Sequence, residues 1–112
     1  MAFQNVVGNK LAQAEMNTAG YETIYTTPLL TRTYVKNIDI CNTNGSAQRF
    51  YIHLVPKGNS ANAGNSLFYN APINGNTTVQ WTGSEILTAG DTIQVQGSAA
   101  GIAVSITGGE AT

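Results

Sequence analysis

Alternation of apolar and polar residues near the C-terminus is the feature that most constrains this fold. Ile93 and Val95 alternate with Thr and Gln, and the pattern returns over residues 102–107, where Ile and Val alternate with Ala, Ser and Thr. Successive side chains of a β-strand point to opposite faces, so the pattern predicts half-buried strands. The outward positions carry Thr, Gln, Ser and Ala in place of Lys and Glu, which favours a surface that packs against another molecule.

The composition fits one domain with few charged residues. The chain has 112 residues, which is typical of a single domain, and only 10% of them are charged, against about 25% in an average protein. The net charge is −1. The basic residues are scattered along the chain, whereas phosphate binding needs a clustered basic surface, so we expect no nucleic-acid partner.

Further strands are predicted after Gly20. Runs rich in β-branched and aromatic residues are separated by Gly, Asn and Pro, which predicts one all-β domain over residues 21–112, an antiparallel β-sandwich or jelly roll. These runs cover residues 21–27, 32–42, 48–55, 67–69 and 77–82. The polar stretch 56–66 is expected to be a long loop.

Local patterns make the prediction more detailed. Asn44-Gly45 suits a tight turn, so we expect residues 32–42 and 48–55 to pair as a hairpin, and residues 91–107 to form another. Unbroken alternation over 32–42 places Tyr34 with Ile38 and Ile40 on one face, with Val35 and Cys41 on the other. Trp81 shares the phase of Val79, which favours the core.

Residues 1–20 lack the strand pattern and form the second predicted segment. Lys10 to Met16 could form a short helix with Asn9 as its N-cap, or the segment could be an extended arm that lies on a neighbouring subunit; the sequence favours neither. Its apolar residues are the expected contact: Phe3, Val6, Val7, Leu11 and Met16. The segment lacks the pattern of a secretory signal, and no apolar run has the length of a membrane span. We therefore expect synthesis in a cytoplasm and no membrane partner.

Residues able to carry chemistry are few and isolated. His53 is the only histidine and Cys41 the only cysteine, and the six acidic residues are scattered. No nucleophile elbow, metal-ligand spacing or phosphate-binding glycine pattern is present, so we expect no catalytic residue, cofactor or metal. Asp91 is expected to bind backbone amides of its turn. Arg49, Tyr51 and His53 share the outward phase of one strand and are the expected exposed contact.

Four segments resemble a known class of protein: Ile24–Pro28, Val35–Ser46, Phe50–Pro56 and Leu87–Ile93. Together they resemble small β-sandwich proteins encoded among the structural genes of tailed bacteriophages, over about residues 20–108. The resemblance implies a virion component without catalytic residues, either a capsid decoration (cement) subunit or a tail or fibre module.

The expected function is therefore that of a capsid decoration protein, a homotrimer that binds the major capsid protein or another virion protein and is assembled in the host cytoplasm. One alternative is a tail, baseplate or fibre component. A second is a carbohydrate-binding module, which requires Tyr51, Tyr69 or Trp81 to be exposed on one face.

Overall fold

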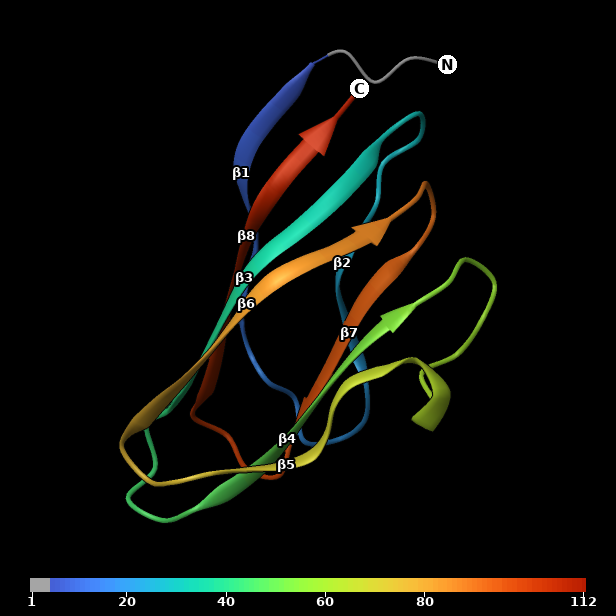
Figure 1. Cartoon of the computed structure of the whole chain (residues 1–112). Helices are drawn as coiled ribbons and strands as arrows, with labels where there is room; N and C mark the ends of the chain where they lie inside the picture. Colours follow the sequence, from blue (N-terminus) through green and yellow to red (C-terminus); the bar gives the residue numbers. More distant parts are fainter. Residues whose placement is uncertain (1–4) are drawn as a thin grey trace.

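The computed structural model describes residues 5–112 as two four-stranded antiparallel sheets packed face to face (Figure 1). The prediction of an all-β sandwich is confirmed. The elements are β1 (Val6–Glu15), β2 (Glu22–Thr26), β3 (Arg32–Asn42), β4 (Gln48–Val55), the 3₁₀-helix η1 (Ala63–Asn65), β5 (Ser66–Ile73), β6 (Thr77–Leu87), β7 (Thr92–Gly97) and β8 (Ile102–Ala111).

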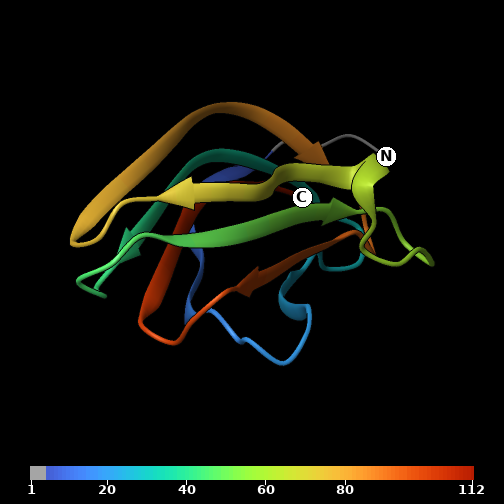
Figure 2. The same ribbon diagram turned by 90° about the horizontal axis from the view of Figure 1, so that it is seen from below.

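The strand pairing is nested, which makes the fold a jelly roll. The strand orders are β1-β8-β3-β6 and β2-β7-β4-β5, so β1 pairs with β8, β2 with β7, β3 with β6, and β4 with β5. The chain behaves as one long hairpin rolled into two layers. Its innermost turn joins β4 and β5, which lie side by side in Figure 2.

The two predicted hairpins are therefore wrong. β3 and β4 lie in different sheets, as do β7 and β8, and each turn carries the chain across the sandwich. At the first crossing, the buried Asn42 side chain donates to the carbonyls of Ser46 and Ile73 and accepts from the amide of Asn44. These bonds hold an open turn in place of the tight one that Asn44-Gly45 suggests.

The inward positions of both sheets form one core. Ile93, Val95, Ile102, Val104 and Ile106 are at most 1% exposed, as the alternation predicts. Each such side chain contributes roughly 1.5–3 kcal/mol when fully buried. Trp81 and Val79 pack against the same core from the edge strand β6, which confirms that assignment.

A row of irregular pairings crosses the sheet that contains β8. The register shifts between Lys10 and Ala12 in β1 and between Val35 and Asn37 in β3, both opposite Thr107. The extra residue in β3 is Lys36. Because of this bulge, Val35 is buried together with Ile38 and Ile40. The prediction that Val35 and Ile38 occupy opposite faces is therefore wrong, because it assumed unbroken alternation.

Gly108 lies in this row and makes the close pairing possible. A Cβ atom at this position would collide with the carbonyl oxygen of Tyr34 in β3. Only a residue without a side chain allows β8 to pair with β1 and β3 at this level.

Residues 6–15 form a strand of the sandwich. β1 pairs with β8 along its whole length, so the helix from Lys10 to Met16, one of the two alternatives for this segment, is not formed. The arm is extended as proposed, but it lies on β8 of its own chain, and the sandwich begins before residue 21. β1 is an edge strand with a bulge at Leu11, which removes the alternation that would have identified it. Residues 1–4 lie outside the described part of the chain.

A polar network joins the two sheets at the end where β1 begins. The Tyr25 hydroxyl of β2 donates to Glu110 Oε2 of β8 at 2.6 Å, and Asn9 Nδ2 of β1 donates to Glu110 Oε1 at 2.9 Å. Because the tyrosine proton is used by Glu110, Thr33 of β3 is the donor in its 2.7 Å bond with the Tyr25 oxygen. Burial, and then the bond to Glu110, raise the pKa of Tyr25 to about 12.

This network predicts a loss of stability at high pH. The pKa of Tyr25 is higher in the folded chain than its ordinary value of 10.0, so its contribution is complete below pH 10 and disappears as pH rises toward 12. Tyr25→Phe should lower the free energy of unfolding by about 1–3 kcal/mol at neutral pH. The difference between the two proteins, measured by urea unfolding, should shrink between pH 10 and 12, and a difference that stays constant with pH would contradict the network.

Candidate functional site: an aromatic face, an apolar end and a hollow

Four rings cluster on the outer face of the β2-β7-β4-β5 sheet. Tyr51 and His53 come from β4, Tyr69 comes from β5, and Tyr21 immediately precedes β2. Ring centroids lie 6.0 Å apart for Tyr21 and Tyr51 and 5.3 Å apart for Tyr51 and Tyr69, both edge to face. Tyr69 is 57% exposed and Tyr21 is 41% exposed, so this aromatic face offers ring surface to a partner.

Tyr21 has a raised pKa. Partial burial raises the pKa of Tyr21, and the nearby hydroxyls of Tyr69 and Tyr51 raise this pKa further because a second phenolate there would be repelled. Tyr21 is therefore uncharged at neutral pH. Tyr51 also donates to Asn70 Oδ1 at 3.2 Å, and the Arg49 guanidinium donates to the Asn70 carbonyl at 3.0 Å.

The three predicted contact residues of β4 differ in exposure. Arg49 is exposed and Tyr51 is half-buried, but His53, which the alternation places on the surface, is completely buried. The rings of Tyr21 and Tyr69 lie 4.7 Å and 6.3 Å from the His53 ring and cover it. Tyr21 comes from a different segment, immediately before β2, and the alternation within β4 carries no information about a ring from that segment.

His53 holds the long loop against the sheet, and its bonding fixes its tautomer. Its Nδ1 lies 3.0 Å from Asn65 Oδ1, which also accepts from the amide of Asn62. Asn65 Oδ1 is thus an acceptor, and Nδ1 must carry the proton. In this tautomer Nε2 is a buried acceptor for which no hydrogen-bond donor is found.

The predicted apolar contact residues of the N-terminal segment are divided by the fold. Val6 is 65% exposed and Val7 is 59% exposed, whereas Leu11 packs partly on the core. Met16 is a core residue and faces no partner. Phe3 lies outside the described residues.

Other exposed apolar residues lie at the same end of the sandwich and were missed. Leu29 is 81% exposed, Leu30 66% and Ile86 55%. Leu29 and Leu30 form the tip of the β2–β3 turn, at the top of Figure 1, near the start of β1. In the sequence, two adjacent leucines follow Pro28 in a segment without strand pattern. This feature could have identified them as exposed apolar residues. We call Val6, Val7, Leu29, Leu30 and Ile86 the apolar end.

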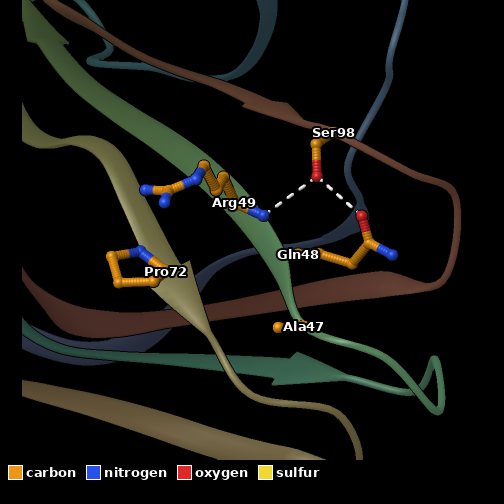
Figure 3. A pocket seen from close by; sticks show the side chains of 5 residues that line it. All are labelled: Ala47, Gln48, Arg49, Pro72 and Ser98. Carbon is orange, nitrogen blue, oxygen red and sulfur yellow. Dashed lines mark hydrogen bonds between the residues drawn. The ribbon is translucent and has the colours of Figure 1, made fainter.

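An open hollow of about 410 Å³ lies at the opposite end (Figure 3). It is lined by Ala47, Gln48, Arg49, Pro72 and Ser98. These residues lie at or beside the β3–β4, β5–β6 and β7–β8 turns, at the bottom of Figure 1.

The described residues contain neither a metal-ligand cluster nor a membrane-spanning helix. Among residues 5–112, no three His, Cys, Asp or Glu side chains gather closely enough to hold a metal ion. Within the same range, no helix has the length and hydropathy that a bilayer crossing requires.

Comparison with known proteins identifies the fold. No family model and no curated protein matches the chain. It is similar in structure to a subunit of the disulfide-linked pili of Bacillus endospore appendages, with a TM-score of 0.57, 15% identity, and coverage of 100% of this chain and 94% of that one. It is also similar to a chain of the T13 viral particle of IBDV, with a TM-score of 0.52 and 8% identity.

These likenesses are to the fold alone. The match covers 96% of this chain but only 30% of the IBDV chain. The 112 residues contain one cysteine, Cys41, whereas a linear polymer linked by disulfides needs two per subunit. Cys41 by itself could join only two copies.

The geometry of His53 predicts its NMR spectrum. Nitrogen-15 shifts of the uncharged imidazole should show Nδ1 protonated and Nε2 unprotonated. Asn65→Ala removes the acceptor of Nδ1 and should cost about 1–3 kcal/mol in unfolding free energy, with Asn59→Ala on the same loop as the control. A ring protonated at Nε2 in the wild-type protein would show that the inferred bonding is wrong.

Proposed function

We propose that this chain is a non-enzymatic structural subunit of an assembled particle, and specifically a bacteriophage capsid decoration (cement) protein. The apolar end is the observation that carries the proposal. Five large apolar side chains, each more than half exposed, lie at one end of a small domain of low charge. They come from the two edge strands β1 and β6 of one sheet and from the β2–β3 turn, and exposed apolar surface at one end of a domain is typical of protein contacts.

The shared fold supports this proposal. A pilus subunit and a chain of a viral particle both use it, and both belong to assemblies built from many copies. In such assemblies, function depends on the contact surfaces between subunits and needs no catalytic centre.

The start of β1 is the proposed contact with the major capsid protein. Val6 and Val7 lie on an edge strand, so both apolar side chains and unpaired backbone groups face a partner. We propose a homotrimer located in the virion. A tail, baseplate or fibre position is the alternative, and immunogold labelling of particles distinguishes the head from the tail.

Carbohydrate binding is a second candidate, favoured by the aromatic face. Tyr21, Tyr51 and Tyr69 lie together with Asn70 and Arg49, a combination that suits stacking on sugar rings and bonding to their hydroxyls. Trp81 packs on the core from the other sheet and takes no part. Retention on a glycan array that Tyr69→Ser abolishes would favour this candidate, and an array without binding would exclude the tested glycans.

The capsid proposal predicts a specific defect in particle binding. The double variant Val6→Ser, Val7→Ser should bind undecorated heads at least roughly tenfold more weakly, since two valines lose burial. Co-sedimentation with purified heads measures this, and circular dichroism confirms folding. Deleting residues 2–16 is unsuitable because it removes β1 and the core residue Met16.

Tyr69→Ser is the matched control for this experiment. Tyr69 is exposed to a similar degree but lies on the aromatic face, so this variant should bind heads normally. Normal binding by the double valine variant, with loss in Tyr69→Ser, would contradict the assignment of the contact to β1.

A further inference from the structure

Two Asn-Gly dipeptides lie in adjacent turns of the sandwich. Asn44-Gly45 belongs to the β3–β4 turn and Asn74-Gly75 to the β5–β6 turn, and both turns lie at the end that carries the hollow, at the bottom of Figure 1. The Asn76 amide donates to the Asn44 carbonyl at 2.9 Å and joins the two turns. The same dipeptide therefore occurs twice in one small region, in two different surroundings.

An Asn-Gly dipeptide can modify itself, because glycine has no side chain to shield its amide nitrogen. This nitrogen attacks the asparagine Cγ, a five-membered succinimide ring forms, and the side-chain nitrogen leaves as ammonia together with the amide proton. Water then opens the ring at one of its two carbonyls. The products are aspartate and isoaspartate, in which the backbone runs through the side chain, and both carry a new carboxylate.

The side chain of Asn44 is fixed by hydrogen bonds. Its Nδ2 donates to Asn42 Oδ1 at 3.0 Å and to the Ala100 carbonyl at 2.8 Å, and Asn42 is completely buried. Both bonds must break before Cγ can turn toward the Gly45 nitrogen. The need to break two hydrogen bonds should slow the reaction by a factor of about ten or more.

The side chain of Asn74 is free of such bonds. It is exposed, and its amide group makes no hydrogen bond with residues 5–112. The Gly75 amide, which would be the attacking group, has no backbone acceptor within the same range. Solvent therefore surrounds the reacting side chain, and no competing bond holds the attacking nitrogen.

The backbone of Asn74 is less free than its side chain. Its carbonyl accepts from Thr77 Oγ1 at 2.6 Å and from Asn42 Nδ2 at 3.3 Å. Ring closure requires rotation about the bond that carries this carbonyl, so the short bond from Thr77 slows the reaction. Because Thr77 is exposed, this bond can open locally to water without unfolding of the domain.

We propose that Asn74-Gly75 is a site of spontaneous covalent modification, and that the fold protects Asn44-Gly45 from the same reaction. The difference in side-chain bonding between two identical dipeptides carries the proposal. The modification adds one negative charge to a chain whose net charge is −1. It changes the end opposite the apolar end, so it is independent of the proposed contact with a capsid.

The isoaspartate product should also weaken the packing of the two turns. Gly75 lies so close to the other turn that a Cβ atom there would be 2.6 Å from the carbonyl group of Gly45. Isoaspartate adds a backbone atom before Gly75, and this contact leaves no room for it. The isoaspartate form, isolated by ion exchange, should therefore unfold at a lower urea concentration than Asn74→Asp, which has the same charge and an ordinary backbone.

Mass spectrometry of aged protein tests the proposal directly. The wild-type chain is incubated in mildly alkaline buffer and then digested with trypsin, which separates the two dipeptides because Arg49 and Lys57 lie between them. Asn74 should be converted at least about tenfold faster than Asn44. Labelling by isoaspartyl methyltransferase identifies the isoaspartate. In urea, where the bonds of Asn44 are absent, the two positions should react at similar rates.

Two variants separate the local causes. Thr77→Val removes the hydroxyl that holds the Asn74 carbonyl but keeps a branched side chain, and it should speed the conversion of Asn74 severalfold. Asn74→Gln is the matched control, since its longer side chain would have to close a six-membered ring. It should stay unmodified at this position, while Asn44 reacts as slowly as in the wild-type chain. Circular dichroism checks that both variants are folded.

Three outcomes would count against the proposal. Equal rates at Asn44 and Asn74 in the folded protein would show that side-chain bonding does not select the site. An unmodified Asn74 in folded protein, under conditions in which the chain in urea reacts, would overturn the assignment. An unchanged rate in Thr77→Val would show that the carbonyl bond does not slow the reaction. None of these results affects head binding by Val6 and Val7, so failure here is distinguishable from failure of the proposed function.

Discussion

Pairing of the first strand with the last is the interaction on which the rest of the structure depends. β8 lies between β1 and β3, so it must bond to strands that are distant from it in sequence on both sides. The other pairs are nested inside this one, and Gly108 keeps β8 close enough to β3. The Tyr25–Glu110 network then ties this sheet to the other at the same end.

This pairing also decides which surfaces the molecule offers. Because most successive strands lie in opposite sheets, turns collect at the two ends of the sandwich, and the outer sheet faces stay continuous. The result is an apolar end, a hollow at the other end, and an aromatic face along one side. Each of these candidate contact surfaces is thus built from segments that are distant in sequence.

The sequence predicted which faces of the strands are buried better than it predicted which strands are neighbours. Ile93, Val95 and Ile102 were placed correctly because burial on one face imposes alternation. The sequence could not predict which strands pair, since β3 and β4 show the same alternation whether they pair or lie in opposite sheets. The bulge at Lys36 and the edge position of β1 also leave no signal in a single sequence.

The candidate surfaces were predictable to a similar extent. Val6 and Val7 are exposed, but burial of Met16 and His53 depends on tertiary neighbours that alternation does not describe. Leu29 and Leu30 were missed because the prediction concerned strands and the apolar N-terminal segment, and the turn between strands was taken only as a connection.

Sedimentation velocity of the wild-type chain over a wide range of concentration tests whether this domain functions through contacts with other copies. The 11.8-kDa chain should convert to a trimer as concentration rises. A chain that remains a monomer at every concentration would contradict it.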